Sequence, residues 1–310
     1  MAGCLCRALF YGNPLAGFYK GGVFLRNTGV PEKGKEIRGH NACLTKVMTV
    51  KRKREIVAIL VLPLLYLYIM KLPDVFFLGL LAFAVTMAQA EFYAMYGVQR
   101  GLRVFGLFSG LLVIFLFYIG FRDIYLFLIF FFILVLLIKL FTIKDSPEGT
   151  LKDISPVVVG FIYVPFILSL LIPVRMVGPE WIIYTGATVW GADSFAYYFG
   201  KNLGKKKLFP AVSPKKTVVG AVGSLLGGLV ASVVVKMFLI PHMTLISAIL
   251  SGIIIGSISI TGDLSESMFK RDSGVKDSSV LIPGHGGILD KLDGIIFATP
   301  VVYIITRFYT

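Results

Sequence analysis

The chain has 310 residues, of which 56% are hydrophobic and only 15% are charged. A soluble domain of ordinary composition is roughly 25% charged, so this chain has too little charge to cover a soluble globule of its size. The composition excludes disordered, collagen-like and disulfide-stapled classes and predicts a polytopic integral membrane protein. The 31 basic residues outnumber the 17 acidic ones, and the resulting net charge of +14 must lie outside the hydrocarbon.

The first 47 residues differ from the rest of the chain. All three cysteines lie there, and no apolar run in it is long enough to cross a membrane. The stretch is not a secretory signal peptide, because its short apolar run is interrupted by Arg7. Met48 is followed at once by four basic residues and an apolar run. We interpret 1–47 as an N-terminal extension without function or carried in by cloning, with a peripheral regulatory segment as the alternative, and 48–310 as the transmembrane catalytic domain.

Nine runs are candidate membrane-spanning helices, because a span needs about 20 mostly apolar residues. They cover roughly 56–72, 75–96, 104–121, 124–143, 154–173, 180–199, 217–240, 243–262 and 294–309. The runs are continuous and show no two-residue alternation, which favours helices over a transmembrane barrel. The expected fold class is therefore all-α.

Basic residues concentrate in the cytoplasmic loops of membrane proteins. If the stretch before the first helix is placed inside and the sides alternate, most loop lysines and arginines fall inside. This distribution predicts a cytoplasmic amino end and an outside carboxyl end, in the cell (inner) membrane. Only two inside segments are long, 200–216 and 263–293, so we expect the functional site at the cytoplasmic face.

Segment 263–293 places six acids and four bases between two apolar helices. Such a mixture beside a membrane indicates a binding site for a polyanion, held partly by basic side chains and partly by Mg²⁺. In proteins Mg²⁺ typically binds one or two carboxylates plus substrate phosphates. Asp290 and Asp293 are spaced i, i+3 and share a face of the last helix if it begins near Leu289. Asp263 ends the preceding helix. The plainer interpretation of these acids is a solvated or capping pair and a polar helix end.

Three further features fall near the inside ends of the helices. The glycines of Pro283–Gly287 let a backbone approach a ligand and present N–H groups to oxyanions, although an ordinary turn is the alternative. The lysines of 201–216 suit either phosphate binding or attraction to anionic lipid. Asp193 and Glu91 lie inside apolar runs, where acids usually face a cavity or a partner. We expect Asp193 to face the site and give Glu91 less weight.

The spacing of the last inside segment closely resembles the signature of the phosphatidate cytidylyltransferase (CDP-diacylglycerol synthase) family. The matching order is Ser267-x-Phe269-Lys270-Arg271-x4-Lys276-Asp277-x5-Pro283-x-His285-Gly286-Gly287-x2-Asp290-x-x-Asp293. The run Ser213–Thr217 and the helix that carries Asp193 also resemble that family. Lys291 stands where the family usually has Arg, which keeps the charge but loses the bidentate fork, and Val219 stands where a Glu is often found.

The resemblance implies transfer of CMP from CTP to phosphatidic acid, giving CDP-diacylglycerol and pyrophosphate for phospholipid biosynthesis, with Mg²⁺. It implies that Asp263, Asp290 and Asp293 hold the metal and act with Lys270 in catalysis. The substrate-binding candidates are Asp193, Ser213, Lys215, Lys216, Ser267, Arg271, Lys276, Asp277, His285, Gly286, Gly287 and Lys291. The expected partners are CTP, phosphatidic acid and the membrane, without nucleic acid; a homodimer is left open.

Three other functions compete with this one. A CTP-dependent polyprenol or phytol kinase, or a synthase acting on archaeal ether lipids, would share this kind of site and differ in its product. A secondary transporter would show inverted repeats and polar residues at the bilayer midplane, whereas the polar residues here gather at one face. A structural scaffold would leave the fixed spacing of acids and bases without an explanation.

Overall fold

A computed structural model describes residues 63–143, 146–276, 278–279 and 287–309. The chain forms two compact units, Met1–Leu65 and Tyr66–Thr310, and the elements named below belong to the second. The predicted extension 1–47 and residues 56–62 of the predicted span 56–72 lie outside the described residues.

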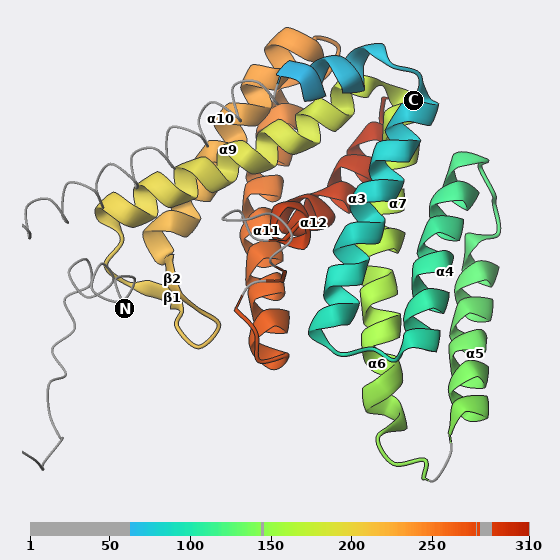
Figure 1. Cartoon of the computed structure of the whole chain (residues 1–310). Helices are drawn as coiled ribbons and strands as arrows, with labels where there is room; N and C mark the ends of the chain where they lie inside the picture. The colour runs from blue at the N-terminus through green and yellow to red at the C-terminus, as the bar shows by residue number, and fades with distance from the viewer. Residues whose placement is uncertain (1–62, 144–145, 277, 280–286, 310) are drawn as a thin grey trace, which may run out of the picture. The chain divides into compact units, whose positions relative to one another are not determined.

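The second unit is built almost entirely from helices, which confirms the predicted all-α class (Figure 1). The helices are α3 (Asp74–Met95), α4 (Arg100–Tyr118), α5 (Ile124–Thr142), α6 (Thr150–Phe161), the π-helical turn η1 (Ile162–Phe166), α7 (Ile167–Ser169), α8 (Leu171–Val177), α9 (Pro179–Leu203), α10 (Val218–Leu239), α11 (Leu245–Asp272) and α12 (Leu289–Thr306). The sequence did not predict the small antiparallel hairpin of β1 (Lys207–Phe209) and β2 (Ser213–Thr217).

Six helical segments of the described chain are long and apolar enough to cross a membrane. They are Asp74–Met95, Arg100–Tyr118, Ile124–Thr142, Thr150–Val177, Val218–Leu239 and Leu245–Asp272, and each overlaps a predicted span. Helices α9 and α12 overlap the predicted spans 180–199 and 294–309 but are not among the six. The count of nine spans stays a prediction.

The predicted span 154–173 is helical but not regular, because the π-helical turn η1 interrupts it. Pro165 lies in this turn and has no N–H to donate to the preceding turn. The buried ring of Tyr163, also in η1, packs 5.2 Å from the ring of Phe269 on α11 and 6.2 Å from that of Phe297 on α12. The interruption therefore lies beside the two helices that carry the signature acids.

Helices α9, α10 and α11 pack closely because small residues line their contacts. A Cβ on Gly252 of α11 would lie 2.7 Å from the carbonyl oxygen of Gly228 on α10, so a larger side chain would push the helices apart. The buried hydroxyls of Tyr184 on α9 and Ser232 on α10 lie 2.6 Å apart, within hydrogen-bond distance.

Buried polar side chains join the earlier helices. Gln89 of α3 donates to the hydroxyl of Tyr93 at 2.8 Å and to the carbonyl of Gly106 on α4 at 3.0 Å. Arg175 of α8 binds Asp74 at the start of α3, with 2.9 Å between Nε and Oδ1. Helix α12 contacts α3, α7, α8, α9 and α11. Its first turn thus lies between α3 and the acidic end of α11.

Candidate active site

Helix α11 continues to Asp272, well past its predicted end near 262, so the expectation that Asp263 ends the helix is wrong. The stretch 263–272 contains no Gly or Pro, and Lys270 and Arg271 in the last turn favour the helix dipole. Because the helix continues, Asp263, Glu266 and Lys270 are spaced i, i+3 and i+7 and share one face.

Three carboxyl groups converge between α11 and α12. Asp263, Glu266 and Asp293 each place one carboxylate oxygen within 4.8 Å of the others. Burial and the nearby Asp263 raise the pKa of Asp293 to about 7. Glu266 Oε1 is buried without a hydrogen-bond partner among the described residues. Crowded oxygen ligands with an unsatisfied oxygen fit a hard divalent cation such as Mg²⁺.

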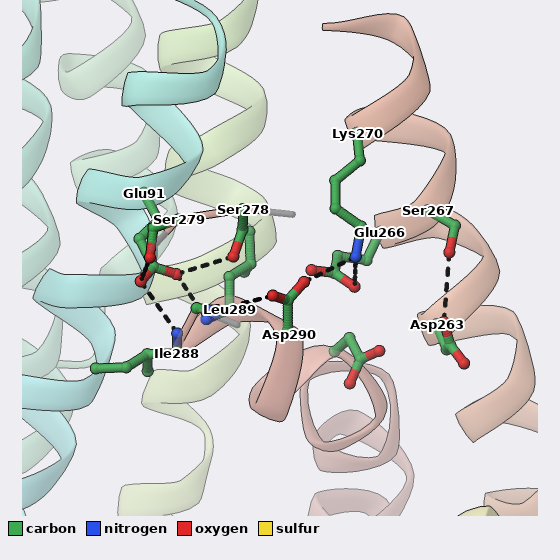
Figure 2. Close-up of polar contacts among 12 residues, drawn as sticks. Glu91, Asp263, Glu266, Ser267, Lys270, Ser278, Ser279, Ile288, Leu289 and Asp290 are labelled. Atoms are coloured by element: carbon green, nitrogen blue, oxygen red, sulfur yellow. Dashed lines mark hydrogen bonds and ion pairs between the residues drawn. The ribbon is translucent and has the colours of Figure 1, made fainter. Parts of the chain in front are cut away.

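Lys270 joins α11 to the first turn of α12, which begins at Leu289 as predicted. Its Nζ lies 2.8 Å from Glu266 Oε2 and 2.7 Å from Asp290 Oδ1 (Figure 2). The N–H of Gly287 donates to Asp290 Oδ2 at 2.8 Å. Burial acts to raise the pKa of Asp290, but hydrogen bonds with Glu266, Lys270 and the Gly287 N–H hold it well below its usual range. Asp290 is thus an ionised partner of Lys270.

The hairpin supplies a second lysine to the acids. Lys216 on β2 places its Nζ 2.6 Å from Asp263 Oδ2 and 3.4 Å from the carbonyl oxygen of Ile260. The next residue, Thr217, is the N-cap of α10 and accepts the Gly220 N–H on its side-chain oxygen at 3.1 Å. The cap fixes where β2 passes into α10, and this places Lys216 against α11.

Two further predicted residues lie at the edge of the acidic group. Ser267 donates to Asp263 Oδ1 at 3.4 Å, one turn along α11. Asp193 on α9 accepts a hydrogen bond of 2.9 Å from Ser259. Asp193 and the acids of α11 and α12 therefore approach one another from three helices.

A further acid, Glu91 of α3, lies on the other side of the α12 start (Figure 2). It is buried, with 3% of its surface exposed. Its carboxylate accepts hydrogen bonds from the side chains of Ser278 and Ser279 and from the backbone of Ile288 and Leu289.

Comparison with known proteins now identifies the family. The model of the cytidylyltransferase family matches residues 52–309, which include every element described above. The chain belongs to the cytidylyltransferase family.

Curated relatives of this cytidylyltransferase-family chain include several bacterial proteins named phosphatidate cytidylyltransferase. The one from Staphylococcus epidermidis is 38% identical over 155 residues, which cover 50% of this chain and 57% of the relative. The Bacillus subtilis protein is 34% identical over 182 residues, 57% of this chain and 66% of the relative. The Synechocystis protein is 49% identical over 118 residues, 38% of this chain and 40% of the relative. The chain thus spans about half the length of the curated relatives that it matches.

The family signature is brought together only in part. Asp193, Lys216, Asp263, Ser267, Lys270, Gly287, Asp290 and Asp293 are the predicted residues that gather around the acids. Lys215 of β2, together with Arg271, Lys276 and Lys291, is exposed and has no ion-pair partner among the described residues. Ser213 opens β2, at the far end of that strand from α10. Asp277, His285 and Gly286 lie outside the described residues.

Sequence reasoning missed Glu266 and undervalued Glu91. Glu266 had a usable signal, because it lies i+3 from Asp263 and four residues before Lys270, a spacing that matters only if the helix continues. For Glu91 the sequence offered no signal beyond the presence of an acid in an apolar run. Its donors lie nearly 200 positions away in the chain, and no local pattern predicts such a contact.

Proposed function

We propose that this chain is a phosphatidate cytidylyltransferase, which transfers CMP from CTP to phosphatidic acid and releases pyrophosphate. The observation that carries the proposal is that the signature acids and bases gather at one end of α11 in a chain of this family. The names of the curated relatives support the same reaction.

The reaction needs one substitution at phosphorus. An anionic oxygen of phosphatidate attacks the α-phosphorus of CTP and forms a new P–O bond. The bond from that phosphorus to the oxygen bridging to the β-phosphate breaks, and pyrophosphate leaves with the electron pair. The attacking oxygen is already ionised, so no general base is required, and the protein acts mainly by positioning and charge neutralisation.

The acidic group would bind the metal. We propose that Asp263, Glu266 and Asp293 hold Mg²⁺, whose charge would neutralise phosphate oxygens when it is bound. Asp290, which the family resemblance also assigns to metal, has both oxygens engaged by Lys270 and Gly287. In this proposal Asp290 fixes Lys270 and the α12 start.

The basic side chains around the acids would hold the phosphates of CTP and of the lipid. Lys216 and Lys270 lie at the acids themselves. Four further basic residues lie near these lysines or the acids in the sequence and are exposed: Lys215, Arg271, Lys276 and Lys291. Each could therefore bind an anion. We also assign Ser213, Ser267, Asp277, His285, Gly286 and Asp193 to substrate binding, because they lie at positions that resemble the motifs of the family. The site would face the cytoplasm, where CTP is made, in the inner membrane of a bacterium.

The test is transfer with position-specific label. The purified full chain is incubated in detergent with phosphatidic acid, Mg²⁺ and CTP labelled at the α- or the γ-phosphate. We expect α-label in a CDP-lipid, equimolar pyrophosphate, and no γ-label in lipid. Transfer of γ-label to a polyprenol or phytol would instead identify a lipid-alcohol kinase. Absence of labelled lipid from well-folded protein would refute the proposal.

A further inference from the structure

Glu91 receives four hydrogen bonds, an unusual number for an acid in a membrane helix. Its Oε1 accepts from the Ser279 hydroxyl at 2.6 Å and from the Ile288 N–H at 3.1 Å. Its Oε2 accepts from the Ser278 hydroxyl at 3.2 Å and from the Leu289 N–H at 2.9 Å. A carboxylate buried in such a helix is costly, and bonds of this charge-assisted kind offset the cost.

The donors come from two places in the chain. Ser278 and Ser279 precede segment 280–286, while Ile288 and Leu289 follow it. One side chain of α3 thus binds Ser278 and Ser279 and also the first residues of α12. The two backbone donors also belong to the start of α12, where N–H groups lack partners within the helix and favour a negative charge.

The contact is linked directly to the acids. Gly287 lies against Glu91, and a Cβ at this position would overlap the Glu91 carboxylate and the Ser278 hydroxyl. The Gly287 N–H holds Asp290, which in turn holds Lys270. Asp293 follows three residues later on the same helix. Any displacement of the α12 start therefore moves both Asp290 and Asp293 relative to α11.

We propose that Glu91 is a positioning residue, which holds the start of α12 together with Ser278 and Ser279 so that Asp290 and Asp293 meet the acidic face of α11. This inference rests on the proposed function for its kinetic consequence, but its structural consequence stands alone. Within the described residues, the hydrogen bonds of Glu91 go to Ser278, Ser279, Ile288 and Leu289 and not to the acids of α11 and α12. Its effect on the acids would pass through Gly287, Ile288 and Leu289.

The test compares Glu91→Gln with Gln89→Met in the full-length chain. Glu91→Gln preserves the shape but turns one acceptor into a donor, which faces either Ser279 and Ile288 or Ser278 and Leu289. Gln89→Met removes a buried polar group from the same helix, and its partners on α3 and α4 lie away from the acids. Both variants are assayed for kcat, KM for CTP, Mg²⁺ dependence, thermal stability and hydrogen exchange of peptides covering 287–292.

For Glu91→Gln we expect kcat to fall by about 10- to 100-fold, as a displacement near 1 Å can cost, with a higher Mg²⁺ requirement and KM for CTP within about twofold. Exchange at either Ile288 or Leu289 should be at least about tenfold faster, since the N–H that faces the new amide group loses its acceptor. Gln89→Met should lower thermal stability and leave kcat, KM for CTP and the exchange of peptides covering 287–292 unchanged. Equal kcat and unchanged exchange in folded Glu91→Gln would overturn the proposal and leave Glu91 a packing residue.

Two possible results, an inactive wild-type chain and a Glu91→Gln variant that does not fold, call for additional measurements. If the wild-type chain makes no CDP-lipid, the proposed function fails, and the exchange measurement alone decides the role of Glu91. If Glu91→Gln does not fold, Ser278→Ala, which removes one of the four donors, carries the test with an expected loss of about three- to tenfold in kcat. No loss in that variant, with unchanged exchange at Leu289, would overturn the proposal.

Discussion

Mg²⁺ should reverse the order of stability of the wild-type chain and its Asp293→Asn variant. The three acids place oxygens within 4.8 Å of one another, and two unit charges at that separation repel by about 3.5 kcal/mol at an effective dielectric constant of about 20. Asp293 takes part in two of the three pairs. Burial and, after it, repulsion from Asp263 raise the pKa of Asp293 to about 7, so proton uptake relieves part of this repulsion. The metal-free Asp293→Asn variant should therefore be at least as stable as the wild type.

Binding of Mg²⁺ should change this order. A cation at 100 times its dissociation constant stabilises the folded state by about 2.7 kcal/mol. The wild-type chain should gain this stabilisation, while Asp293→Asn, with one carboxylate ligand made neutral, should lose most of it. Thermal unfolding in detergent, followed by tryptophan fluorescence at a fixed scan rate, measures both chains in EDTA and in a series of Mg²⁺ concentrations.

Asp290→Asn is the matched control, because it removes the same charge from the same turn. Asp290 is paired with Lys270, so its amide should lower the unfolding temperature with or without Mg²⁺ and keep the gain on adding the ion. The reasoning is refuted if Asp293→Asn gains as much from Mg²⁺ as the wild type does, or if Asp290→Asn is the variant that loses the gain.

Three further substitutions separate the remaining roles. Lys270→Met leaves the mostly buried carboxylates of Glu266 and Asp290 without their cation and should cost about 3 kcal/mol of stability. An unchanged unfolding temperature would contradict a stabilising role for these two ion pairs. Gly287→Ala should reduce turnover at least about 100-fold because its Cβ overlaps neighbouring side chains, whereas Gly101→Ala, which meets open space, should stay within about twofold in the same assay. Lys216→Met should raise KM for CTP severalfold; Lys139→Met, whose ion-pair partner is Asp153 on α6, should change only stability, and equal KM values would remove Lys216 from substrate binding.

Much of the fold follows from apolar length, because a run of about 20 such residues has few alternatives to a helix. The sequence could not predict the hairpin 207–217, whose strands have only three and five residues. The sequence also could not predict the C-terminal boundary of α11. Hydropathy shows where the apolar residues of a span end, whereas the helix ends where its backbone hydrogen bonds stop. The fixed spacing in 263–293 predicted Asp263 and Asp293 as candidates, and the structure brings them together. Glu91 depends instead on a contact between distant segments that only the packed structure contains.

The length of α11 determines the depth at which the chemistry would occur. A helix of 28 residues is about 42 Å long, while the hydrocarbon layer is about 30 Å thick. Asp263 lies about 27 Å along α11 from Leu245. If α11 enters the hydrocarbon at Leu245 and runs along the membrane normal, Asp263 would lie near the boundary where lipid phosphates lie. An anionic lipid could thus react while its acyl chains remain in their leaflet, and the nucleotide alone would cross from water. Turnover should then respond to bilayer thickness, because a thicker membrane would draw the acids below the headgroup plane.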